Sequence, residues 1–169
     1  MKEPSLMIEK ARSEDTSAIV WVINEANREA FGRIIPKEHF REPIITREEF
    51  DEQSERMAFY VNRQNEKVVA VAALGTEEQE CGRIRWVYVL PKYQKQGVGT
   101  ALIAYIERLA RETGLKKIRL VTDNGAEWAI RFYTKLGYRL VRRVPNPWGS
   151  DVWMEKQIQS KSREKQKRW

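Results

Sequence analysis

The sequence predicts a single domain of the α/β (α+β) class, with a mixed central sheet of about seven strands and helices on both faces. Two features of the element order indicate this class. In the first half of the chain, two apolar segments are joined by the short polar turn Gln64-Asn65-Glu66, which predicts an antiparallel hairpin. In the second half, strand segments alternate with amphipathic helical segments, as in sheets whose strands are connected by crossover helices.

The first third of the chain is expected to contain one strand and two helices. Residues 6–11 are expected to form the strand, and Ser13 is the expected N-cap of a helix that ends near Gly32. Apolar residues of this helix fall on one stripe: Ile19, Val22, Ile23, Ala26 and Ala30. Residues 33–45 contain two prolines and are expected to form a loop. The Thr-x-x-Glu pattern at residues 46–49 is a capping box that begins a second, short helix.

The remaining elements follow from the same signals. Strands are expected over residues 59–63, 68–74, 83–89, 118–122, 138–143 and 151–158. Apolar residues at helical spacing from Val98 to Leu109 predict an amphipathic helix that is stopped by Gly114. A last helix is expected from Ala126 to Leu136, before Gly137.

Composition restricts the class of protein. The length of 169 residues fits one domain, and 41% hydrophobic with 33% charged residues is typical of a globular protein. No apolar run has the length of a membrane span, and the first residues lack the apolar region of a signal peptide. The single cysteine, Cys81, excludes an internal disulfide. We therefore expect a cytoplasmic protein with no membrane partner.

The net charge of +7 is concentrated at the end of the chain. Residues 159–169 contain five Lys/Arg and one Glu, a net charge of +4, which leaves +3 for the other 158 residues. This distribution predicts one domain over residues 1–158, followed by a flexible basic tail over residues 159–169. It argues against nucleic acid as the partner of the domain.

A glycine-containing turn between a strand and a helix is the first candidate site. The strand ends at Leu90-Pro91, and Gln94-x-x-Gly97-x-Gly99 opens the helix. Such a turn presents free backbone N–H groups at the positive end of a helix dipole, which suits an anion such as a diphosphate. A P-loop would need Gly-Lys-Ser/Thr, and a dinucleotide fingerprint would need a glycine at Leu102, so neither motif fits.

This turn and the strand before it resemble the acyl-CoA pyrophosphate loop of the GNAT superfamily of N-acetyltransferases. The resemblance implies acetyl-CoA as the acetyl donor and no metal. It implies that the backbone of Val87, Tyr88 and Val89 binds the pantetheine arm. The residues expected to hold the diphosphate are Gln94, Lys95, Gln96, Gly97, Val98, Gly99 and Thr100. Because Gly97 and Gly99 lack a Cβ, backbone and phosphate can approach closely there. A tight turn alone would explain one glycine more easily than two.

A second motif, from Ala129 to Tyr138, is similar to the later cofactor-binding helix of that family. The resemblance places Tyr133 at the tyrosine that many members use as a general acid. A phenol within hydrogen-bond reach can protonate the coenzyme A thiolate as it leaves. The alternative is that Tyr133 is an interface tyrosine that packs beside Phe132.

The sequence departs from the family pattern at two positions. Ala126 stands where the family often has an asparagine that contacts the cofactor, and Asn124 is the candidate replacement. Arg85 stands where many members have a glutamate, with Arg83 on the same face of the strand. The acceptor ammonium, with a pKa of about 10.4, must then lose its proton to a residue elsewhere or to ordered water. Otherwise only the small fraction of free amine reacts. The only histidine, His39, is a weak candidate for this base.

The resemblance implies an acetyl-CoA-dependent N-acetyltransferase that moves acetyl directly to a primary amine in a ternary complex. The alternative is a non-catalytic CoA-binding or nucleic-acid-associated module with the same fold. Residues 32–57 have a net charge of −2, which favours a small cationic amine or a peptide or protein amine as acceptor. A salt-bridged helix surface would explain the same charges. The sequence leaves open whether the chain forms a homodimer.

Overall fold

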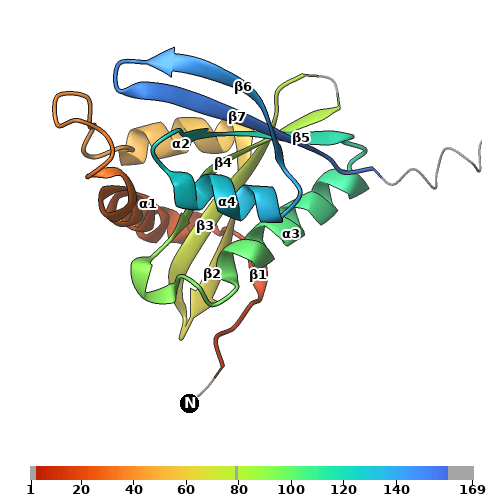
Figure 1. Ribbon diagram of the computed structural model, residues 1–169. Helices are drawn as coiled ribbons and strands as arrows, with labels where there is room; N and C mark the ends of the chain where they lie inside the picture. Colours follow the sequence, from red (N-terminus) through yellow and green to blue (C-terminus); the bar gives the residue numbers. More distant parts are fainter. Residues whose placement is uncertain (1–2, 79, 160–169) are drawn as a thin grey trace, which may run out of the picture.

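The computed structural model describes residues 3–78 and 80–159, which form a seven-stranded mixed sheet in the order β1-β2-β3-β4-β5-β7-β6 (Figure 1). The strands are β1 Ile8–Lys10, β2 Met57–Gln64, β3 Lys67–Thr76, β4 Cys81–Val89, β5 Lys117–Asp123, β6 Arg139–Asn146 and β7 Gly149–Gln157. The helices are α1 Thr16–Phe31, α2 Arg47–Arg56, α3 Val98–Glu112 and α4 Glu127–Lys135, with 3₁₀ turns η1 Ser13–Asp15 and η2 Pro91–Tyr93. The predicted fold class is confirmed. Apart from Gln159, the predicted basic tail lies outside the described residues.

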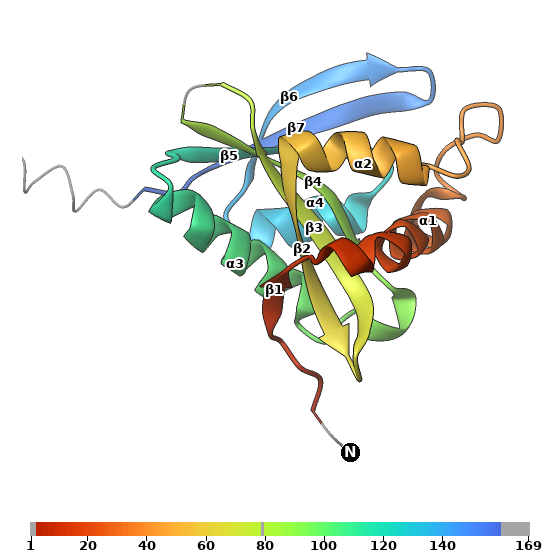
Figure 2. The same cartoon turned by 180° about the vertical axis from the view of Figure 1, so that it is seen from behind.

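Helices cover both faces of the sheet. Figure 1 shows α3 and α4 on one face, and the reverse view in Figure 2 shows α1 and α2 on the other. Each face has its own apolar core. The core under α3 contains Leu102 and Ile106, and the core under α1 contains Ile19 and Ile23, all fully buried. In the described part of the chain, none of the helices combines the length and the apolar character needed to cross a bilayer.

The centre of the sheet is split. β4 pairs with β3 along most of its length, but it pairs with β5 in parallel only where Cys81–Arg83 face Lys117–Arg119. The register between β3 and β4 shifts between Val71 and Ala73, and Trp86 opposite this shift has a φ of 57°. This combination is a β-bulge, which bends a strand and increases its twist. The edge of β4 beyond Arg83 therefore diverges from β5.

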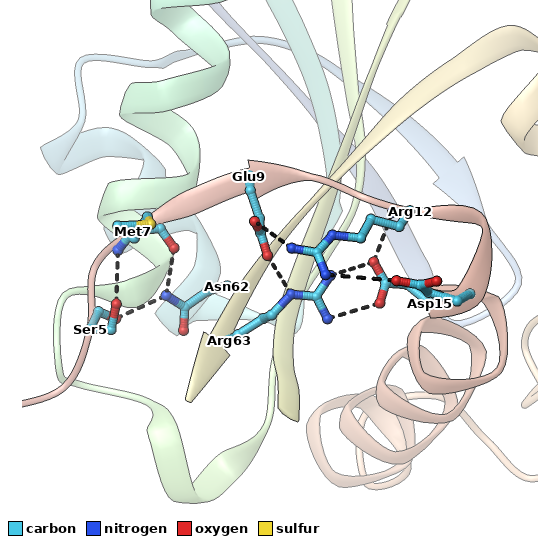
Figure 3. A network of polar contacts seen from close by, with 8 residues as sticks. Ser5, Met7, Glu9, Arg12, Asp15, Asn62 and Arg63 are labelled. Atoms are coloured by element: carbon cyan, nitrogen blue, oxygen red, sulfur yellow. Dashed lines mark hydrogen bonds and ion pairs between the residues drawn. The ribbon is translucent and has the colours of Figure 1, made fainter. Parts of the chain in front are cut away.

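An arginine network fixes the start of the chain against β2 (Figure 3). Arg63 of β2 donates to Asp15 Oδ1 at 2.8 Å and forms further ion pairs with Asp15 Oδ2 and Glu9. Asp15, the third residue of η1, also accepts the backbone N–H of Arg12 at 2.7 Å. Ser13 is the first residue of this turn and not its N-cap, so the predicted cap at Ser13 is wrong. The Arg63 guanidinium, through its hydrogen bonds, holds the pKa of Asp15 below its ordinary 3.8, although burial opposes this.

We predict that this network makes the domain sensitive to acid. Because the pKa of Asp15 is lower in the folded state, its stabilisation is present above about pH 4 and is lost as pH falls through the folded-state pKa. Asp15→Asn should cost about 1–3 kcal/mol at neutral pH, because it leaves Arg63 with one carboxylate fewer. Urea unfolding from pH 7 to pH 3 measures both effects.

Glu14→Gln is the matched control. Glu14 is exposed, and its ion pair with Arg12, at 3.7 Å, contributes little to the free energy of unfolding. Equal pH dependence of stability in wild type and Asp15→Asn would contradict the assignment.

Candidate active site

The loop that connects β4 to α3 is held in place by side chains of its own residues. Gln94 Nε2 donates to the carbonyl of Val89 at 2.9 Å, and Gln96 Nε2 donates to the carbonyl of Lys92 at 3.1 Å. Lys95 and Gly97 have left-handed φ angles of 61° and 86°. These contacts fold the exposed segment into a compact turn directly before α3.

The N-terminus of α3 is free to bind an anion. Gly97 is the N-cap of this 15-residue helix, and no side chain caps it. A Cβ on Gly97 would meet only the Leu6 side chain, at 3.8 Å, so the space around this position is open. The free N–H groups of the first turn and the helix dipole both favour negative charge. These are the features that an anion-binding loop needs.

Gly99 differs from this expectation. It lies inside α3, and a Cβ there would come within 3.3 Å of Phe132 Cζ on α4. The missing Cβ makes room for the Phe132 ring, which gives this glycine a packing role that the sequence did not predict; the close approach of a phosphate stays a prediction. The glycine at this position therefore allows α3 and α4 to approach each other across the split in the sheet.

The side chains of the predicted pantetheine strand divide between the two cores. Val87 and Val89 pack against the core under α3, and Tyr88 packs against the core under α1. The Tyr88 hydroxyl donates to Oδ1 of Asn27, a buried residue of α1, at 3.0 Å. Burial raises the pKa of Tyr88 to about 12. Sequence analysis missed Asn27, although it follows Ile23 by one helical turn and interrupts an apolar stripe.

Tyr133 lies on α4 with only 8% of its surface exposed. Its ring contacts Phe132 and Tyr138 edge-on, with centroids 5.1 Å and 5.8 Å away. Burial raises the pKa of Tyr133, and the neighbouring phenol of Tyr88 raises it further. Tyr133 therefore keeps its proton throughout the physiological pH range, as a proton donor must.

Asn124 and Ala126 lie in the turn between β5 and α4. Ala126 is fully buried at the start of the helix. Asn124 is exposed, its backbone N–H donates to the carbonyl of Ser150 at 2.9 Å, and its side-chain oxygen accepts from Arg143. The Asn124 amide is thus already bound to β6.

The loop between α1 and α2 meets the β6–β7 hairpin. His39 lies against Trp148, with ring centroids 5.3 Å apart, and Trp148 Nε1 donates to Asp123 Oδ2 at 2.6 Å. Asn24 of α1 ties down the end of this loop through the backbone of Ile44 and Ile45. His39 is therefore engaged with an aromatic ring.

Potential metal ligands and the cysteine were located in the described residues. No group of three or more His, Cys, Asp or Glu residues that could hold a metal ion occurs in the described ranges. Cys81 is fully buried, and its burial raises the pKa of the thiol, which disfavours the reactive thiolate.

Comparison with known proteins agrees with this geometry. A family model described as "Acetyltransferase (GNAT) family" matches residues 20–138. The chain belongs to the GNAT acetyltransferase family. The resemblance inferred from the two motifs is thereby confirmed.

Two individual relatives are similar to this GNAT chain in sequence. YxbD of Bacillus subtilis (strain 168) is 36% identical over 80 residues, which are 47% of this chain and 48% of YxbD, so the match spans about half of that relative. The aminoalkylphosphonate N-acetyltransferase of Salmonella typhimurium (strain LT2) is 26% identical over 147 residues, 80% of this chain and 86% of that protein.

Solved structures show the same fold. The PaiA N-acetyltransferase of Thermoplasma acidophilum, in complex with coenzyme A, has a TM-score of 0.77 at 19% identity. The match covers 89% of this GNAT chain and 98% of that chain.

We predict that Gly99→Val destabilises the protein through packing. The added side chain would collide with Phe132, and overpacking of this kind costs about 1–3 kcal/mol. Thermal unfolding should show a lower Tm for Gly99→Val, and the double variant Gly99→Val/Phe132→Leu should recover part of the loss. An unchanged Tm with a loss of coenzyme A affinity in calorimetry would instead support the original phosphate interpretation.

Proposed function

We propose that this chain is an acetyl-CoA-dependent N-acetyltransferase that transfers acetyl directly to a primary amine in a ternary complex. The observation that carries the proposal is the open loop at the N-terminus of α3, next to the diverging edge of β4. Membership of the GNAT family supports acetyl-CoA as the donor. The names of relatives that acetylate amino groups, such as the Salmonella typhimurium enzyme, support an amine acceptor.

In this proposal the chain divides the binding of the donor between two segments. The backbone N–H groups of residues 94–100 bind the diphosphate, and the backbone of Val87, Tyr88 and Val89 binds the pantetheine arm. Asn124 contributes a cofactor contact only if its amide leaves Arg143. Acetyl-CoA supplies the acetyl group as a thioester.

Tyr133 is proposed as the general acid. The amine nitrogen forms a bond to the thioester carbonyl carbon, the C–S bond breaks, and Tyr133 Oη gives its proton to the departing sulfur. The attacking amine is neutral, and its nitrogen loses one proton to solvent as the amide forms. Solvent returns one proton to the Tyr133 tyrosinate, so the products are the amide and the free thiol and Tyr133 is restored. Tyr133 is protonated at neutral pH, as this role requires, while its raised pKa makes it a weaker acid than an ordinary tyrosine.

The negative charge of residues 32–57, on which a cationic acceptor was predicted, is partly paired with arginines. Glu42 forms an ion pair with Arg28, and Glu49 forms one with Arg41. Glu49 also completes the capping box with Thr46 that was predicted from the sequence. These contacts favour the alternative explanation, a salt-bridged helix surface.

Release of free thiol from acetyl-CoA across a panel of amines tests the proposed function. We expect amine-dependent release above the rate of hydrolysis, with acetylated amine detected by mass spectrometry in equal amount. A protein that binds coenzyme A in calorimetry but acetylates no amine in the panel would instead support the non-catalytic module.

We predict that Tyr133→Phe lowers kcat by a factor on the order of 10²–10⁴, because it removes the proton donor and keeps the ring. The affinity for coenzyme A and the Tm should stay close to those of the wild type. Tyr105→Phe is the matched control, since Tyr105 lies on α3 and stacks on Tyr60. Unchanged turnover in Tyr133→Phe, with chemistry shown to limit the rate, would assign Tyr133 to packing.

A further inference from the structure

An aromatic residue surrounded by arginines occupies the face of the sheet beside α1 and α2. The Arg83, Arg119 and Arg142 guanidinium carbons lie 4.9, 5.9 and 4.7 Å from the centroid of the Trp153 ring. These residues come from the four neighbouring strands β4, β5, β6 and β7, and their cross-strand pairing puts them on one face. Arg85 lies two residues along β4 from Arg83, on the same face. We call these five side chains the arginine face.

The arginine face is not covered by a helix. α1 and α2 pack on β2, β3 and β4, so β6 and β7 continue past the edge of α2, as Figure 2 shows. Arg85 and Arg142 are exposed, and Trp153 is half-buried. A small molecule that reaches the split in the sheet from the α2 side can therefore contact Arg85 and Arg142.

The carboxylates near the arginine face neutralise it unevenly. Arg119 forms ion pairs with all three of these carboxylates: Glu77 at 3.2 Å, Glu78 at 3.8 Å and Glu155 at 2.8 Å. Arg83 shares Glu77 at 2.8 Å. Over residues 3–78 and 80–159, Arg85 and Arg142 form no ion pair. The positive charges of Arg85 and Arg142, the two exposed arginines of the arginine face, are therefore not neutralised by these carboxylates.

Two buried donors in the same place lack an acceptor. Within the described chain, Arg83 Nε and Trp153 Nε1 are the buried side-chain nitrogen atoms that have no hydrogen-bond partner. Buried polar groups are normally satisfied, and an unsatisfied one is costly. These unsatisfied donors add to the excess of positive charge in the arginine face, which a ligand with negatively charged oxygen atoms would offset at the exposed Arg85 and Arg142.

The arginine face begins next to the proposed reaction centre. Arg85 directly precedes the bulge residue Trp86 and lies where many family members have a glutamate. Side chains two residues apart on a strand are about 7 Å apart, so Arg83 and its neighbours are one such step from Arg85. An acceptor with its amine at the split and an acidic group a few bonds away would span this distance.

We propose that the arginine face binds an anionic group of the acceptor, so that the preferred substrate is a primary amine that also carries a carboxylate or phosphonate. This inference rests on the proposed function. Guanidinium groups bind both kinds of oxyanion in bidentate geometry. The same charge repels polyamines, which have no anionic group to offset it.

Matched pairs of acceptors test the inference at low salt. One pair is β-alanine and β-alaninamide, and the other is 2-aminoethylphosphonate and its neutral diethyl ester, with spermidine as the polycationic amine. We expect kcat/KM for the acidic member of at least one pair to exceed that of its neutral partner by about tenfold or more. Arg142→Gln and Arg85→Gln should each remove most of this preference, measured as the ratio of kcat/KM within a pair, because each removes a guanidinium that contacts the anionic group.

The control variant is Arg108→Gln, an exposed arginine of α3 that stacks on Tyr105 on the opposite face. It should leave every ratio unchanged. Equal kcat/KM for acidic and neutral members, or faster acetylation of spermidine than of every acidic amine, would overturn the inference and leave the proposed function standing.

Calorimetry separates the two proposals. 2-Aminoethylphosphonate and β-alanine are titrated into the protein saturated with coenzyme A. If no amine causes release of free thiol from acetyl-CoA, the proposed function is wrong. The titration alone then tests whether the arginine face binds an anion. Binding of either acid by wild type that is weakened about tenfold in Arg142→Gln but not in Arg108→Gln supports the site. Absence of binding of both, or equal binding in all variants, overturns it.

Discussion

The early separation of β4 from β5 is the constraint on which the rest of the site depends. The two parallel strands pair over only three residues, and the bulge at Trp86 turns β4 away from its neighbour. A sheet that stayed paired to the end of β4 would use the backbone groups that the proposed pantetheine contact needs. The close approach of Gly99 on α3 to Phe132 on α4 places the loop proposed to bind the diphosphate near the helix of Tyr133, the proposed general acid.

Two tyrosines of the proposed site, Tyr88 and Tyr133, have different surroundings. The Tyr88 hydroxyl donates a hydrogen bond to the side-chain oxygen of Asn27 on α1, and this contact fixes the phenol. Tyr133 lies between aromatic rings, and burial raises its pKa together with the influence of Tyr88. Burial raises the pKa of both phenols, and Tyr88 raises that of Tyr133 further, so both are protonated at neutral pH. A site with this property can donate protons but cannot use either tyrosine as a base. The proton of the amine must therefore leave by another route.

Charge on the acceptor side is arranged by pairing between distant residues and not by local composition. The acidic residues of the α1–α2 region are partly neutralised by Arg28 and Arg41, although the count of charges there is negative. The arginine face has three nearby carboxylates, yet all of them contact Arg119 and leave Arg85 and Arg142 with excess positive charge. The charge count of residues 32–57 therefore does not describe the charge at the arginine face, which is the basis for proposing an acidic amine instead of a polyamine.

The sequence by itself determined the order of the elements, the glycine turn and the tyrosine helix. These features depend on local periodicity, caps and turn residues, which act over a few positions of the chain. Helix and strand ends were correct to within a few residues; the capping box at Thr46 was confirmed, and the cap at Ser13 was wrong.

Only the tertiary structure decided the reason for Gly99, the partner of Tyr88, the engagement of Asn124 with Arg143 and the gathering of arginines around Trp153. Each of these is a contact between residues far apart in the chain. Such contacts depend on how strands and helices are brought together, and no local pattern in a single sequence encodes the choice of partner.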